Sequence, residues 1–184
     1  MIQKLKSMLA QNPRVIVGID GMAAAGKSTL ASKLASAFGG EVVRMDDFFL
    51  PTELRTEKRL SEAGGNVHYE RFAKEVAAPL REHASFEYGV FDCSQFKITE
   101  KRHIKGNGLI IVEGAYTFRP EFRDLYDLKV FMSIDSETQL MRILQRSGAE
   151  KLEAFKEKWI PMEKKYFETY GIEAIADVLL DGKA

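Results

Sequence analysis

The segment GMAAAGKS at positions 21 to 28 constrains the fold more than any other part of the chain. It follows Arg14 to Asp20, a run of mostly apolar, β-branched residues, and it precedes a segment in which Leu30, Leu34 and Phe38 recur every four residues. The run is typical of a strand buried on both faces, and the recurring apolar residues are typical of an amphipathic helix. The sequence therefore predicts a strand, a tight glycine-containing loop and a helix in direct succession.

Between a strand and a helix, the pattern GxxxxGK[ST] is typical of a phosphate-binding loop. Small residues let the backbone wrap closely around a phosphate, and the N–H groups of the loop and of the helix N-terminus attract its negative charge. Lys27 is expected to reach the β- and γ-phosphates of ATP, and the Ser28 hydroxyl is expected to ligate Mg²⁺. A glycine-rich turn with an exposed lysine is the alternative, which the agreement of motif and context disfavours. The residues expected to bind ATP are Gly21, Ala23, Ala24, Ala25, Gly26, Lys27, Ser28 and Thr29.

Further short apolar runs predict additional strands at Glu41–Met45, Leu109–Val112, Leu128–Ile134 and Val178–Leu180. Helical patterns separate most of these runs. Strands that alternate with helices predict an α/β fold in which a parallel sheet is covered by helices on both faces.

The middle of the chain contains three segments of different character. Thr52–Asn66 is charged and ends near two glycines, so we expect a mobile surface loop. Tyr69–Glu82 has apolar residues at helical spacing, and Phe86–His103 shows the weak alternation of a hairpin. We therefore expect a loop, a helix and a hairpin in this order.

The C-terminal third is predicted to be mainly helical. Ser136 and Gln139 have the spacing of a capping box, which predicts a helix start. Phe155 and Trp159 belong to an apolar stripe that is more typical of a core than of a ligand site. Pro161 is expected to kink this helix or to begin a new one.

Composition indicates a soluble globular chain and excludes several classes of partner. With 184 residues, of which 45% are hydrophobic and 29% charged, we expect one domain spanning residues 1–184. Equal numbers of basic and acidic residues, 27 each, give no overall field for nucleic acid or an anionic membrane. Cys93 is the only cysteine and no apolar run approaches the length of a membrane span, so a reducing, cytoplasmic setting is expected.

The reaction class is narrowed by motifs that are missing. The chain has neither an apolar run ending in Asp-Glu nor an Asn-Lys-x-Asp motif, which disfavours motor ATPases and GTPases. The remaining large class transfers phosphate to a small molecule. That chemistry needs a carboxylate to accept the proton of the acceptor hydroxyl and cations to neutralise the transferring phosphoryl group.

Carboxylates follow two of the predicted strands. Asp46 and Asp47 stand at the end of one, and Glu113 stands at the end of another. Ligands of open α/β sheets bind beside these strand ends, so one aspartate is expected to face the γ-phosphate and Glu113 the metal. If the extended backbone continues past Met45, the two aspartates point to opposite sides. The alternatives are a turn-capping role for the two aspartates and an ordinary turn position for Glu113.

Two arginines supply the expected cations. Arg142 and Arg146 are four residues apart, so they share one face of the predicted helix. They are expected to close over the phosphates, with an ordinary solvated face as the alternative.

The sequence resembles the uridine kinase group of the phosphoribulokinase/uridine kinase family over about residues 14 to 181. The resemblance is carried, in order, by GIDGMAAAGKSTLASKLA, MDDFFLP, GGNVHYERF, LIIVEGAY, WIPMEKKYF and ADVLLD. It implies a P-loop kinase fold with a five-stranded parallel core, a hairpin and a helical lid at about residues 142–160. It also implies that Asp46 accepts the proton, that Phe49 lies near the substrate and that Glu113 lies near Mg²⁺.

The resemblance further implies an acceptor site, in which this chain departs from the family at two places. Asn66-Val67-His68 stands where uridine kinases have Asn-x-Asp, and Phe91-Asp92 stands where they have Tyr-Asp. The implied catalytic residues are Lys27, Asp46, Arg142 and Arg146, and the implied substrate-binding residues are Asp46, Phe49, His68, Phe91 and Arg142.

The leading expected activity is transfer of the ATP γ-phosphate to the 5′-hydroxyl of uridine or cytidine, with Mg²⁺. Another hydroxyl metabolite, such as a vitamin precursor or a sugar phosphate, remains open as acceptor. A nucleotide-binding regulatory module without turnover is the alternative from another class, which the presence of Asp46 and Glu113 disfavours. A small-molecule partner is expected, and a homo-oligomer is left open.

Overall fold

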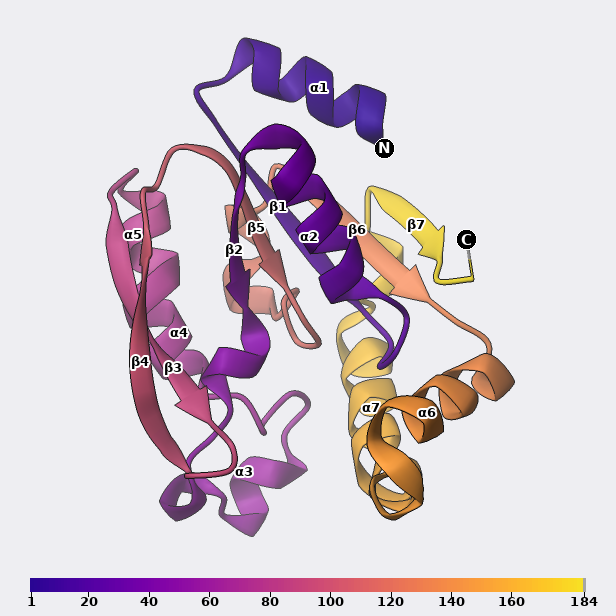
Figure 1. Ribbon diagram of the computed structural model, residues 1–184. Coiled ribbons are helices and arrows are strands. Elements are labelled where there is room, and N and C mark those ends of the chain that lie inside the picture. The colour runs from indigo at the N-terminus through magenta and orange to yellow at the C-terminus, as the bar shows by residue number, and fades with distance from the viewer. Residues whose placement is uncertain (184) are drawn as a thin grey trace.

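The computed structural model, which describes residues 1–183, contains a five-stranded parallel sheet (Figure 1). The strands are β1 (Arg14–Gly21), β2 (Glu41–Arg44), β5 (Gly108–Glu113), β6 (Leu128–Ser133) and β7 (Val178–Asp181), in the order β2-β5-β1-β6-β7. Each neighbouring pair is parallel. The predicted α/β fold with a five-stranded parallel core is confirmed.

Alternate residues of the central strand β1 enter two separate cores. Val15, Val17 and Ile19 pack in the core that includes residues of α1 (Ile2–Gln11) and α2 (Lys27–Phe38). Ile16 points to the opposite face and joins the second core. Because both faces of the strand are buried, its sequence is a continuous apolar run rather than an alternating one.

The second core is covered by a helical segment and a hairpin, seen on the left of Figure 1. The helical segment consists of α4 (Tyr69–Phe72), a π-helical turn at Ala73–Ala77 and α5 (Ala78–Arg81). The hairpin pairs β3 (Phe86–Asp92) with β4 (Lys97–Ile104). Both predicted elements are confirmed, and Pro79 lies directly after the π-helical turn, in the first turn of α5.

The expected plain loop at Thr52–Asn66 is wrong, since the segment contains a 3₁₀ turn at Thr52–Leu54 and α3 (Glu57–Ser61). The Thr56 side chain caps α3 by accepting the N–H of Arg59. The Arg59 guanidinium then donates to the carbonyls of Gly65 and Val67, which ties the segment to the residues that follow it.

The predicted capping box is also wrong. The N-cap of α6 (Ser136–Ala154) is Asp135, whose carboxylate accepts the N–H of Thr138 at 3.0 Å. Gln139 is buried and donates instead to the carbonyl of Ala23 at 3.1 Å. A tertiary contact with the glycine-containing loop thus replaces the local hydrogen bond that the spacing predicts.

A helical segment in three parts follows. Gly148 interrupts α6 with φ +81° and ψ 171°, a π-helical turn spans Phe155–Trp159, and α7 covers Ile160–Tyr170. Pro161 lies in the first turn of α7, directly after the π-helical turn, so the predicted break in the regular α-helix near this residue is confirmed. Within residues 1–183, no helix combines the length and the apolar character needed to cross a membrane.

Candidate active site

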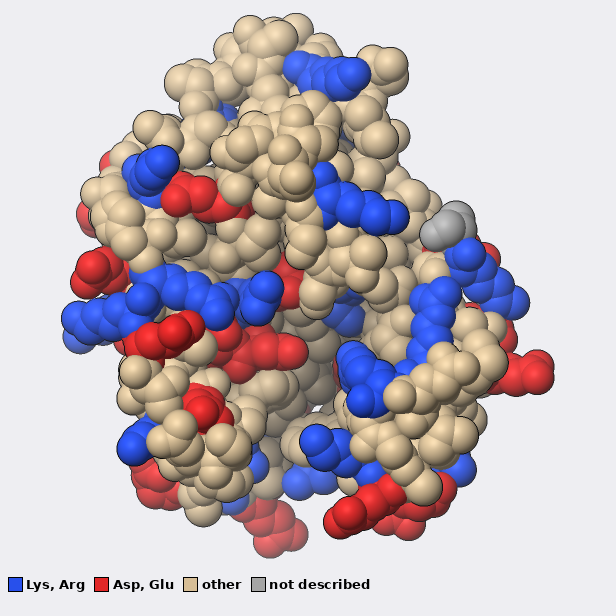
Figure 2. Space-filling view, in the orientation of Figure 1, with Lys and Arg blue, Asp and Glu red and all other residues tan. Residues whose placement is uncertain are grey.

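A cavity of about 1030 Å³ opens at the carboxyl ends of β1, β2 and β5, where Figure 2 shows a hollow flanked by charged side chains. Its walls come from the loop after β1, from the segments after β2 and β5, and from α6 to α7. The lining residues are Ala23 to Leu30, Lys33, Asp46, Phe49, Asn66, Val67, Glu113 to Tyr116, Arg142, Arg146, Phe155, Trp159, Glu163 and Gly182.

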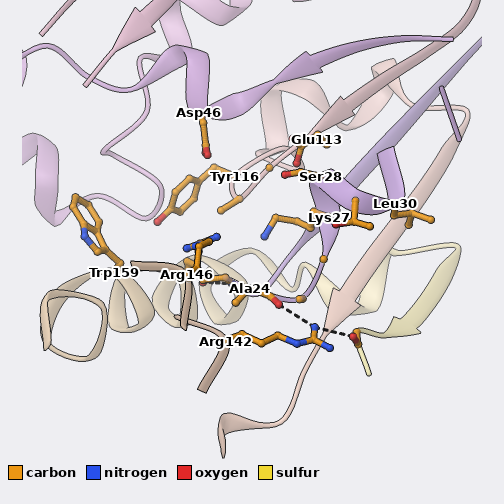
Figure 3. A pocket seen from close by; sticks show the side chains of 18 of the residues that line it. Ala24, Lys27, Ser28, Leu30, Asp46, Glu113, Tyr116, Arg142, Arg146 and Trp159 are labelled. Carbon is orange, nitrogen blue, oxygen red and sulfur yellow. Dashed lines mark hydrogen bonds between the residues drawn. The ribbon is translucent and has the colours of Figure 1, made fainter. Parts of the chain in front are cut away.

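The loop at positions 21 to 28 depends on glycine at its first residue. Gly21 has φ +139°, and a Cβ there would lie 2.1 Å from the carbonyl oxygen of Met132. Lys27 folds back over the loop, with Nζ 2.7 Å from the carbonyl oxygen of Gly21 and 2.9 Å from that of Met22. Figure 3 shows its ammonium group pointing into the cavity. A phosphate entering the cavity would meet this cation and the N–H groups around it.

A buried carboxylate that sequence reasoning missed supports the base of the loop. Asp20 is fully buried and accepts the N–H groups of Gly21 and Phe118 at 2.7 and 2.9 Å and the hydroxyl of Tyr166 at 2.8 Å. Burial raises its pKa to about 6, although these hydrogen bonds and Lys27 oppose the shift. An acid inside an otherwise apolar strand was the only sequence signal for this role.

The two neighbouring aspartates take different directions because the chain turns into a 3₁₀ helix at Met45–Phe48. Asp46 lines the cavity, whereas Asp47 accepts hydrogen bonds from Tyr88 and Arg102, both at 3.1 Å. The expected extended backbone past Met45 is therefore wrong, but the two carboxylates do diverge.

Asp46 is exposed to solvent within the cavity, and the cavity walls surround it. The loss of bulk water around it raises its pKa above the usual range, while Lys27, Arg146 and Arg44 act in the opposite direction. A raised pKa makes a carboxylate a stronger base, which suits proton abstraction.

Glu113 and Ser28 lie together at the end of β5 and the start of α2 (Figure 3). Burial raises the pKa of Glu113, and the neighbouring Ser28 hydroxyl opposes this shift. Within residues 1–183, no three His, Cys, Asp or Glu side chains form a ready cation cage. These two oxygen ligands fit Mg²⁺, which usually takes one or two protein ligands and completes its shell with water and substrate phosphates.

The two arginines of α6 both line the cavity but differ in their contacts. Arg142 donates to the carbonyls of Ala24 and Gly182 at 3.2 and 2.9 Å, shown as dashed lines in Figure 3. It therefore holds the loop to the turn after β7. Arg146 extends over the cavity, where its charge acts on Asp46 and its guanidinium lies 5.7 Å from the Phe155 ring centroid.

Aromatic and polar side chains form the wall opposite the loop. Phe155 and Trp159 line the cavity rather than the core, so the core assignment of this stripe is wrong. Tyr116 has φ +74°, a conformation that is uncommon outside glycine and is found at functional sites. The Oδ1 atom of Asn66 is buried without a hydrogen-bond partner among residues 1–183, and Asn66 lies in the same wall.

Of the remaining residues expected to bind the substrate, one lines the cavity and two do not. Phe49 lines the cavity. His68 does not, because its Nδ1 lies 3.1 Å from a Glu70 carboxylate oxygen at the start of α4. Phe91 is buried within β3, opposite Ile98, and it does not line the cavity either.

A further residue, Glu163 of α7, was missed altogether. Its carboxylate is buried and accepts the N–H of Ala23 at 2.9 Å, across 140 residues of sequence. Burial raises its pKa to about 7, Lys27 lowers it, and Asp20 and Asp46 raise it. Glu163 is surrounded in the sequence by other charged residues, a pattern that is typical of a solvated helix face and gives no sign of this contact.

Comparison with known proteins is consistent with this arrangement. Residues 16–174 match the profile of the "Phosphoribulokinase / Uridine kinase family". Uridine kinase of Limosilactobacillus reuteri (strain DSM 20016) is 26% identical over an alignment of 153 positions, which covers 78% of this chain and 70% of that protein. Uridine kinase of Chlamydia pneumoniae is 24% identical over an alignment of 184 positions, which covers 91% of this chain and 82% of that protein.

Solved structures share the fold. A possible uridine kinase from Bacillus stearothermophilus has a TM-score of 0.68 at 20% identity, with 98% of each chain covered. D-glycerate 3-kinase from Cryptococcus neoformans has a TM-score of 0.63 at 16% identity, with 100% of this chain and 96% of that chain covered.

Proposed function

Because the chain belongs to the phosphoribulokinase/uridine kinase family, we propose that its cavity binds ATP with Mg²⁺ and transfers the γ-phosphoryl group to a hydroxyl of a small molecule. One observation carries this proposal. Lys27, Asp46 and Glu113 come from three separate segments of the chain and line the same cavity. A phosphate-binding cation, a base and a metal-binding carboxylate are the groups that such a transfer needs.

Asp46 is the general base. The acceptor hydroxyl oxygen forms a bond to the γ-phosphorus, the bond from that phosphorus to the β–γ bridging oxygen breaks, and ADP leaves with the electron pair. The hydroxyl proton passes to the Asp46 carboxylate and then to solvent. The raised pKa of Asp46 favours this uptake, since a stronger base binds the proton better in the transition state.

Lys27 and the loop stabilise the charge on the transferring group. The lysine exchanges the carbonyls of Gly21 and Met22 for phosphate oxygens, while the loop N–H groups donate to the same anion. Arg146 is the arginine placed to stabilise the negative charge on the transferring group, because it faces Asp46 across the cavity. Arg142 acts through the loop that it holds.

Ser28 and Glu113 would hold the magnesium ion, Ser28 directly and Glu113 through bound water. The ion supplies positive charge that neutralises the β- and γ-phosphates. Ser28 and Glu113 lie together at the cavity wall, so both oxygen ligands are on the same side of the loop.

Uridine or cytidine is the leading acceptor. Phe49, Tyr116 and Trp159 offer aromatic surface for a planar base, and the unpartnered Asn66 Oδ1 offers an acceptor for a ribose hydroxyl. The relatives that are named uridine kinases support this choice.

A hydroxyl metabolite without a nucleobase is the second candidate. It is favoured by His68, which stands at the position of the family's ribose-binding aspartate and is held by Glu70 away from the cavity. Such an acceptor would use Asn66 and Tyr116 without needing His68.

An ATP-consumption assay over a panel of nucleosides, vitamin precursors and sugar phosphates tests the proposal. We expect one acceptor class to raise ADP formation well above the acceptor-free rate, and Asp46→Asn to remove the increase. ATP binding without acceptor-dependent ADP formation across the panel would instead indicate the non-catalytic nucleotide-binding module.

A further inference from the structure

A carboxylate of the protein itself accepts a hydrogen bond from one N–H group of the phosphate-binding loop. Glu163 of α7 accepts the N–H of Ala23 at 2.9 Å, and only 8% of the residue is exposed. Ala23 is the third residue of the motif, where the loop turns toward the cavity. The carbonyl of Ala23 accepts a hydrogen bond from the Gln139 side chain of α6 at 3.1 Å, so both backbone polar groups of Ala23 are hydrogen-bonded to side chains.

The position of Glu163 conflicts with the charge of a nucleotide. ATP brings several negative charges to a loop that already faces a carboxylate, and like charges in a poorly hydrated site repel strongly. Two outcomes are possible in principle: the carboxylate leaves, or it takes up a proton. Its burial and the packing of Tyr166, one turn further along α7, against Asp20 oppose departure.

We propose that Glu163 takes up a proton from solvent when the loop binds ATP, so that nucleotide binding is coupled to protonation of this side chain. The step is the conversion of a carboxylate to a carboxylic acid, and no covalent bond to the nucleotide forms. The neutral acid removes the repulsion and can donate a hydrogen bond to a phosphate oxygen. This inference rests on the proposed ATP site but not on the identity of the acceptor.

The charged and titratable groups that face Glu163 come from every side of the cavity. Lys27 of α2 favours the carboxylate, whereas Asp20 of β1 and Asp46 after β2 disfavour it. Tyr116 after β5 is neutral and is affected by the same carboxylate, since the charge of Glu163 helps to raise its pKa. Two arginines of α6 complete the set: Arg142 donates hydrogen bonds to two carbonyls, and Arg146 extends toward Asp46.

When a phosphate engages Lys27, the main group that favours the charged form of Glu163 is neutralised. The carboxylates of Asp20 and Asp46 and the phosphate then act together to raise the pKa of Glu163 above its value of about 7 in the free protein. At pH 8, the free carboxyl group is about nine-tenths ionised, so binding should take up close to one proton.

Calorimetric titration with ATP and Mg²⁺, without acceptor, measures this proton directly. The binding enthalpy is determined at pH 8 in buffers of different ionisation enthalpy, and the slope gives the protons taken up. We expect about 0.9 proton per ATP at pH 8 and about 0.1 at pH 6, where Glu163 is already protonated. The dissociation constant should rise by up to about tenfold per pH unit above 7.

Glu163→Gln keeps an oxygen for the Ala23 N–H but cannot titrate, so its uptake at pH 8 should fall to near zero. Glu168→Gln is the matched control, since Glu168 lies on the same helix with 67% of its side chain exposed. It should behave as the unchanged protein does. Glu163→Met serves the same purpose if thermal unfolding shows that Glu163→Gln does not fold.

The outcomes separate this inference from the proposed function. ATP binding without proton uptake overturns the role of Glu163 and leaves the kinase proposal intact. Equal uptake by the unchanged protein and Glu163→Gln also overturns it, because another group then takes the proton. No ATP binding by the unchanged protein at either pH contradicts the nucleotide site itself.

Discussion

At the residue scale, Lys27 is the group whose removal should separate chemistry from folding. Its ammonium contacts only loop carbonyls among the described residues, so Lys27→Ala removes the phosphate-binding cation without opening a core cavity. Loss of one such electrostatic contact typically lowers kcat by about 10²–10³-fold. Turnover and thermal unfolding measured together test this expectation, and near-normal turnover in a folded variant would exclude Lys27 from the reaction.

Asp46 and Asp47 form a matched pair for locating the base. Asp46→Asn should lower kcat by about 10²–10⁴-fold with little change in ATP affinity, because only the proton acceptor is lost. Asp47→Asn should cost much less in kcat, since its carboxylate contacts Tyr88 and Arg102 of the hairpin instead. Steady-state kinetics at saturating ATP measure both variants. A larger kcat loss in Asp47→Asn would transfer the base role to Asp47.

Glu163 should make stability depend on pH. Its pKa rises from 4.5 to about 7 on folding, so between these values the folded protein binds more protons than the unfolded chain. The free energy of unfolding should therefore fall as pH rises from about 4.5 to 7, and Glu163 should account for at most about 3 kcal/mol of this decrease.

Glu163→Gln removes that titration. The free energy of unfolding of the variant, relative to the unchanged protein, should rise by up to about 3 kcal/mol between pH 4.5 and 7. Urea unfolding at several pH values measures the difference. A constant difference across the range would show that the buried carboxyl group does not titrate in this window.

At the scale of elements, α6 and α7 hold the phosphate-binding loop through its backbone. Gln139 and Glu163 bind the carbonyl and the N–H of Ala23, and Arg142 binds the carbonyl of Ala24. Movement of these helices would therefore displace the loop. Gly148 is the point where α6 departs from helical geometry, within the segment predicted to act as a lid.

Gly148→Ala should change the cavity wall. Gly148 has φ +81° and ψ 171°, a conformation that is almost restricted to glycine, so an alanine costs about 1–3 kcal/mol or moves the backbone. Because Arg146 and Phe155 lie on either side of Gly148, we expect kcat to fall together with stability.

Gly171→Ala is the control for this substitution. Gly171 also has positive φ, at the end of α7, and a Cβ there would have no neighbour within 4 Å. We expect a similar loss of stability with unchanged kcat. Thermal unfolding and kinetics of both variants test the difference, and equal kcat values for both would argue against a role for Gly148 in the site.

At the scale of the whole molecule, the sequence predicts the sheet well because its strands are buried on both faces. Burial of this kind leaves continuous apolar runs, and the glycine-containing loop fixes which strand precedes α2. The loop, Asp46 and Glu113 were predictable for the same reason, since they directly follow such strands. Local geometry was less predictable, as the 3₁₀ turn after Met45 shows.

The remaining site residues depend on contacts that are distant in sequence. Glu163 meets the loop across 140 residues, and Tyr166 meets Asp20 across 146. Trp159 lines the cavity because of how α6 and α7 are placed, and helical spacing by itself is equally compatible with a core position. No local pattern reports which face of such a helix reaches the loop.

The central claim is that one cavity transfers phosphate from ATP to a small-molecule hydroxyl with Asp46 as base. Phosphorus NMR of a reaction with ATP, Mg²⁺ and the acceptor that the panel identifies tests it most directly. The account predicts equal amounts of ADP and a new phosphomonoester of the acceptor, and a rate about 10²–10⁴-fold lower in Asp46→Asn. Release of inorganic phosphate in place of the phosphomonoester, or an unchanged rate in Asp46→Asn, would contradict it.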